Sequence, residues 1–62
     1  MIQKSLGLVD TDADGVINFF WDDDHEGVDI QLEDIFGHTV SATFYKKDLI
    51  KTLKRLTKKL EN

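Results

Sequence analysis

Hydrophobic and polar residues alternate through the middle of the chain with the period of a β-strand. In the segment 28–35 the hydrophobic residues Val28, Ile30 and Leu32 fall on one face of a strand, and the polar residues Asp29, Gln31 and Glu33 fall on the other. The segment 38–45 returns to the same period after a break that includes Gly37. We therefore predict two half-buried strands that pair as a hairpin.

Two further strands are expected nearer the N-terminus. The segment 16–22 is rich in β-branched and aromatic residues, which favour extended structure. It is followed by a cluster of acidic residues, His25 and Gly27, which is typical of a hairpin turn. A short edge strand over 5–9 would enter the sheet through the loop 10–15.

The period changes to that of a helix over residues 46–60. Hydrophobic residues recur there at spacings of mostly three and four, and lysines and Arg55 surround them. Asp48 in the first turn and lysines in the last turn complement the helix dipole. The apolar stripe consists of Leu49, Ile50, Leu53, Leu56 and Leu60.

These elements predict one α+β domain over 1–62, an antiparallel meander of three or four strands with a C-terminal amphipathic helix packed on one face. The expected core combines the helix stripe with the inward strand residues, namely Ile17, Phe19, Trp21, Val28, Ile30, Leu32, Val40, Ala42 and Phe44. The opposite face would carry Asp22, Asp29, Gln31, Glu33, Ser41 and Thr43. Phe20, Tyr45, Ile35 and Phe36 fall outside this core, which indicates a contact with a partner or a second copy.

Charge is divided sharply along the chain. Residues 1–45 contain ten acids and one base, whereas residues 46–62 contain seven bases and two acids. The net charge of −4 therefore conceals an acidic body joined to a basic helix. Because 62 residues without cysteine can assemble little core and no disulfide, we expect a homodimer.

One segment resembles the calcium loop of EF-hand and dockerin proteins. Asp10, Asp12, Asp14, Gly15 and Val16 match its first seven positions, and an apolar residue follows. The resemblance implies a weak Ca²⁺ site held by the three carboxylates and the Val16 carbonyl. The position that should hold a bidentate glutamate is a tryptophan, and the flanking residues are strand-like. A plain hairpin turn is the alternative interpretation.

Other chemistry finds less support in the sequence. The segment 22–26 could bind a cation or sense pH, but its composition is also that of a solvated turn, and His38 has no evident partner. Nothing resembles a catalytic triad or a phosphate loop, and so small a chain can hardly enclose a pocket, so we expect no enzymatic activity. Without an apolar run near 20 residues or a signal sequence, we expect a cytoplasmic protein that does not contact membranes.

In length, lack of Cys and Pro, acidic strands and lysine-rich terminal helix, the chain resembles small bacteriophage and prophage proteins. The resemblance implies an inhibitor or regulator that binds a host protein stoichiometrically in the host cytoplasm. We expect the contact to involve Asp22, Asp29, Glu33, Phe20 and Tyr45, with a basic or nucleic-acid-binding host protein as the partner. Direct nucleic-acid binding through the basic helix is the second alternative, although no aromatic residues are interleaved with its lysines.

Overall fold

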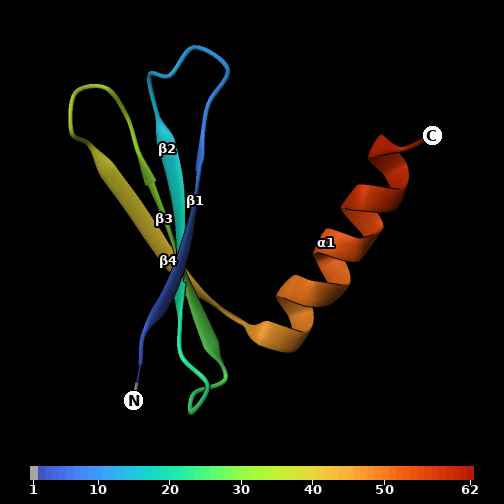
Figure 1. Ribbon diagram of the computed structural model, residues 1–62. Helices are drawn as coiled ribbons and strands as arrows, with labels where there is room; N and C mark the ends of the chain where they lie inside the picture. Colours follow the sequence, from blue (N-terminus) through green and yellow to red (C-terminus); the bar gives the residue numbers. More distant parts are fainter. Residues whose placement is uncertain (1) are drawn as a thin grey trace.

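The computed structural model describes residues 2–62 as one four-stranded antiparallel sheet followed by one helix. The strands β1 (Lys4–Val9), β2 (Val16–Trp21), β3 (Gly27–Glu33) and β4 (Thr39–Tyr45) lie side by side in chain order, as Figure 1 shows. The helix α1 (Lys46–Leu60) begins directly after β4. The predicted α+β meander with a C-terminal helix is confirmed.

The pairing register gives the sheet one apolar side and one polar side. Leu6, Phe19, Ile30 and Ala42 form one continuous row across the four strands. The adjacent row consists of Gly7, Asn18, Gln31 and Ser41, so neighbouring rows face opposite sides. This confirms the faces predicted from the alternation.

Each of the three hairpin turns begins with an aspartate that organises it. One Oδ1 atom of Asp10, Asp22 or Asp34 accepts backbone N–H groups from residues two to four positions later, at 2.8–3.0 Å. Such side-chain bonds replace the strand ladder with a turn. They explain why β2 and β3 end at Trp21 and Glu33, before the limits 22 and 35 predicted from composition.

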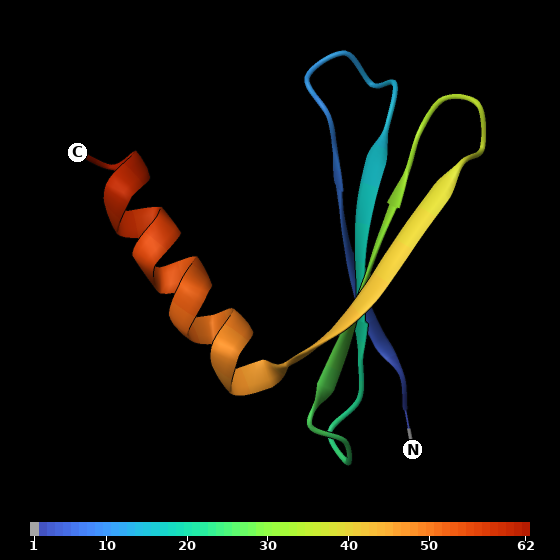
Figure 2. The ribbon, with the colours of Figure 1, turned by 180° about the vertical axis from the view of Figure 1, so that it is seen from behind.

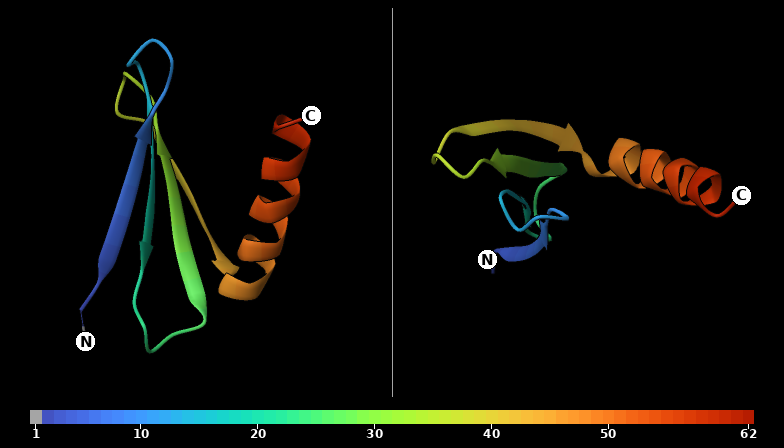
Figure 3. Two further views of the ribbon diagram at one scale, coloured as in Figure 1. Left: turned by 45° about the vertical axis from the view of Figure 1, so that its right-hand side comes forward. Right: turned by 90° about the horizontal axis from the view of Figure 1, so that it is seen from above.

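The helix diverges from the sheet beyond its first turns. Figure 2 shows the helix and sheet as two arms that meet at the end of β4, and the right-hand view in Figure 3 shows α1 running away from the strands. The molecule accordingly extends over 37 × 32 × 17 Å. Leu49 is half-buried, and α1 contains no buried residue.

The expectation that the apolar side closes into a core within one chain is wrong. Among residues 2–62, Val28 is the only buried hydrophobic residue, at 7% exposure. Leu32 and Val40 on the sheet and Leu53 and Leu56 on the helix are all exposed, although they lie on the predicted sides. The reason is geometric, because the helix does not lie over the strands beyond its first turns (Figure 2).

Candidate interaction surfaces

The polar side of the sheet brings together four of the five residues predicted to bind a partner. Phe20 pairs with Asp29, and Asp29 pairs with Thr43, so their side chains lie on one side. Glu33 follows on the same side of β3, and Tyr45 ends the same side of β4. We call Phe20, Asp29, Glu33 and Tyr45 the acidic face.

The acidic face is exposed and partly preorganised. Thr43 donates its hydroxyl to Asp29 Oδ1 at 2.6 Å, which orients that carboxylate across the strands. Asp29 and Glu33 are exposed, Tyr45 is 63% exposed and Phe20 is half-buried. The strand register of residues 4–45 places no lysine or arginine on this side, since Lys4 lies in the row of Trp21 on the apolar side. The two carboxylates therefore face solvent without a basic neighbour on the same side.

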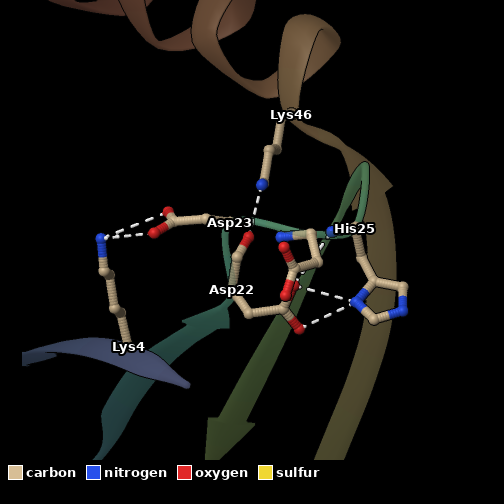
Figure 4. A network of polar contacts seen from close by, with 6 residues as sticks. Lys4, Asp22, Asp23, His25 and Lys46 are labelled. Atoms are coloured by element: carbon tan, nitrogen blue, oxygen red, sulfur yellow. Dashed lines mark hydrogen bonds and ion pairs between the residues drawn. The ribbon is translucent and has the colours of Figure 1, made fainter. Parts of the chain in front are cut away.

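Asp22 lies apart from the acidic face, in the turn between β2 and β3. Its carboxylate oxygens lie 2.9 and 3.0 Å from His25 Nδ1, which must donate because a carboxylate can only accept (Figure 4). The same carboxylate accepts the backbone N–H groups of Asp24 and His25. The His25 side-chain bond, followed by the backbone N–H groups and the charge of the ring, holds the pKa of Asp22 below its ordinary value of 3.8. Asp22 therefore has a structural role in this turn, and its contact with a partner stays a prediction.

Two lysines attach neighbouring elements to this turn. The Lys4 ammonium lies 3.1 Å from the Asp23 carboxylate, and the Lys46 ammonium donates to the Asp22 carbonyl (Figure 4). The Lys46 backbone N–H also donates to the Glu26 carbonyl at 2.8 Å. Lys46 therefore fastens the start of α1 to the β2–β3 turn at the point where helix and sheet meet.

The turn between β3 and β4 repeats this chemistry. His38 Nδ1 lies 3.0 Å from Asp34 Oδ2, so the interpretation of His38 as a residue without a partner is wrong. The His38 backbone N–H is the main cause that keeps the pKa of Asp34 below 3.8, and the His38 side chain adds to it. A signal existed in the sequence, since Asp10, Asp22 and Asp34 recur every 12 residues, each at the end of a strand.

The calcium-like loop forms the turn between β1 and β2. Asp10 Oδ1 accepts the N–H groups of Asp12 and Asp14, the role that Asp22 and Asp34 play in turns without a calcium pattern. The left-handed residue is Ala13, with φ of 61°, whereas the pattern assigns the sharp turn to Gly15. Over residues 2–62 no group of three or more carboxylate, histidine or cysteine side chains is gathered as a metal site. Turn formation accounts for Asp10 by itself, and calcium binding by Asp10, Asp12, Asp14 and the Val16 carbonyl stays a prediction.

One exposed apolar surface was not foreseen from the sequence. The apolar side of the sheet and the stripe of α1 border a hollow of about 400 Å³, where Leu6, Phe19 and Trp21 face Leu49, Ile50 and Leu53. Leu8 and Val40, farther along the same side of the sheet, are 66% and 71% exposed. The alternation identified these residues as apolar, but it carried no information on what covers them.

Comparison with known proteins yields no relative. Neither protein-family models, nor curated protein sequences, nor solved structures match the chain. As for membranes, α1 is the single helix of residues 2–62, and it is neither long nor apolar enough to cross one.

Proposed function

We propose that this protein is a small protein-interaction module that binds a basic partner protein stoichiometrically through the acidic face. The observation that carries the proposal is the exposed pair Asp29 and Glu33, bordered on one side of the sheet by the aromatic residues Phe20 and Tyr45. Aromatic side chains supply contact area, and unpaired carboxylates select a basic surface.

The extent of the negative charge supports a protein that normally binds nucleic acid as the partner. Asp29 and Glu33 stand four residues apart on one strand, about 13 Å at the rise of a β-strand. Turns rich in carboxylates lie at both ends of the sheet, so the negative charge continues beyond the face itself. A groove that binds phosphates would be attracted to such a charged surface. The general resemblance to small phage proteins favours a host protein in the cytoplasm, inhibited or regulated by occupation of that groove.

The proposal is tested by capture with matched charge reversals. The wild-type chain, immobilised through a C-terminal tag, is exposed to nuclease-treated bacterial lysate, and the retained proteins are quantified by mass spectrometry. In one variant Asp29 and Glu33 are replaced by Lys; in the control Asp12 and Asp14, in the β1–β2 turn, are replaced by Lys. Both variants change the net charge by the same amount.

We expect the wild type and the turn control to retain the same basic protein, and the face variant to lose it by at least tenfold. Added duplex DNA should release the partner in proportion to its concentration, because both would occupy one groove. If both variants retained equally little of the basic protein, the interaction would depend only on the overall negative charge of the chain. If the face variant retained as much as the wild type, these two carboxylates would have no role in binding. Circular dichroism of each variant establishes that the sheet is intact.

A further inference from the structure

The hollow between sheet and helix leaves a large apolar surface without a cover. It lies on the side of the sheet opposite the acidic face and continues from the first turns of α1 along the stripe to Leu60, which is 74% exposed. Leu32 and Val40 extend it toward the far end of the sheet. The sheet and the helix form the two arms of an open structure (Figures 1 and 3), and apolar side chains from both arms line the hollow.

The solvent-accessible surface of this chain exceeds that of a compact folded chain of the same mass, and the excess estimates the area available to a partner. A compact folded chain of 7.1 kDa exposes about 4,100 Å², whereas this chain exposes 5432 Å², an excess of about 1,300 Å². An ordinary protein interface removes about 800 Å² from each partner, and obligate homodimers bury about 2,000–5,000 Å² in total. Covering the excess on two copies would place the assembly within the homodimer range.

The charges identify a second copy as the cover. Acids are concentrated in residues 1–45 and bases in residues 46–62, so each molecule carries both halves of a complementary pair. A helix with an apolar stripe between lysines fits a site with apolar walls and acidic turns at both ends. This chain contains both the helix and the site. In a two-fold symmetric dimer, the helix of each copy can therefore occupy the site of the other copy. Because Val28 is the one hydrophobic residue that is buried among residues 2–62, the folded chain needs a cover at all times, and a second copy of the same chain is always present.

We propose that the protein is an interlocked homodimer in which α1 of each copy lies in the sheet–helix hollow of the other. The stripe of the entering helix then contacts the apolar side of the partner's sheet, and the two helices pack beside each other between the two sheets. Both acidic faces remain on the outside of the assembly. The pairing goes beyond the proposed function and does not depend on it.

The mass in solution is the first test. Sedimentation equilibrium and native mass spectrometry of the untagged chain should give twice 7.1 kDa at micromolar concentration, with a melting temperature that rises with protein concentration. A mass of 7.1 kDa at every concentration, with a melting temperature that does not change, overturns the proposal.

Substitutions then locate the interface. Leu53→Glu places a charge in the hollow, and Phe36→Glu, at the 80%-exposed tip of the β3–β4 turn, is the matched control. We expect Leu53→Glu to weaken association by at least a hundredfold and Phe36→Glu to leave it unchanged. If Phe36→Glu weakened association and Leu53→Glu did not, the interface would lie elsewhere and the proposal would be wrong.

Because Leu53→Glu could unfold a chain that is stable only as a dimer, cross-linking provides a readout on folded protein. The chain contains no cysteine, so Leu53→Cys in one copy can be paired with Leu32→Cys in another, and the two chains can be distinguished by mass. The control pairs Leu53→Cys with Ser41→Cys, on the opposite side of the sheet. We expect a disulfide heterodimer with Leu32→Cys at more than ten times the control yield; equal yields, or a preference for Ser41→Cys, exclude interlocking. If the chain captured no basic protein, the mass and cross-linking results would not change. The proposed partner binding and the proposed homodimer can therefore be refuted independently.

Discussion

Asp22 shows how one carboxylate can serve the fold although composition places it in an acidic cluster. It accepts two backbone N–H groups and the His25 ring nitrogen, and these bonds favour the ionised form. The group therefore has a lower pKa in the folded chain than in the unfolded chain. Its stabilising contribution is complete above the unfolded value of 3.8 and is lost as the pH falls through the folded value.

Asp22→Asn should therefore make the melting temperature depend less on pH at acidic pH. Asparagine keeps an oxygen for the backbone N–H groups but cannot ionise, so the wild type should lose its advantage over the variant as the pH drops below 3.8. Melting temperatures from pH 7 to about pH 2, followed by Trp21 fluorescence at fixed protein concentration, would measure this convergence. Asp24→Asn is the control, because Asp24 enters the hydrogen bonds of this turn through its backbone N–H. Parallel curves for wild type and Asp22→Asn would contradict the assigned role.

At the scale of elements, α1 depends on contacts at its first residue. It starts at Lys46 without a side-chain cap from Tyr45, and it follows β4 with no intervening loop. The Lys46 backbone and side chain donate to the Glu26 and Asp22 carbonyls. A 15-residue helix is marginally stable in isolation, so these bonds and the packing of its stripe must hold it in place.

Lys46→Met tests this attachment while conserving the apolar part of the side chain. Loss of the bond to the Asp22 carbonyl should cost about 1 kcal/mol, the usual net contribution of a partly solvated hydrogen bond. Amide exchange should accelerate most in the first turns of α1. Lys47→Met, one position along on the exposed side of the helix, should change neither quantity. Urea unfolding and hydrogen exchange mass spectrometry provide the two measurements, and equal effects of both substitutions would refute the anchoring role.

The elements themselves could be read from the sequence because each depends on a local period. The predicted helix 46–60 coincides with α1, and the predicted strand starts lie within one residue of those observed. Strand ends were less accurate, since Asp22 and Asp34 redirect the backbone through side-chain bonds that periodicity does not encode. The angle between α1 and the sheet could not be predicted, because no local period encodes contacts such as the bond of Lys46 to the Asp22 carbonyl, 24 residues away in the chain. The acidic face could be predicted, whereas the open hollow could not.

At the scale of the whole molecule, two electrostatic effects oppose each other when copies meet. Each chain carries a net charge of −4, and this repulsion alone predicts that added salt strengthens association. The separation of charge predicts the opposite, because seven bases lie in the helical part and ten acids in the sheet part. Interlocking places unlike charges within a few ångströms of each other, whereas the net charges act across the whole width of the assembly.

We therefore expect the dimer to dissociate more readily at high salt. The screening length falls from about 30 Å at 0.01 M to about 3 Å at 1 M, which removes long-range repulsion first and contacts between exposed charges afterwards. The dissociation constant from sedimentation should thus pass through a shallow minimum and rise by about tenfold toward 1 M. Replacing Lys54 and Lys59 with Gln, which stand on the two sides of the stripe, should remove that rise, whereas Lys47→Gln near the start of the helix should preserve it. Association that strengthens steadily up to 1 M would mean that the apolar hollow alone joins the copies and that the sorted charges serve only the outer surface.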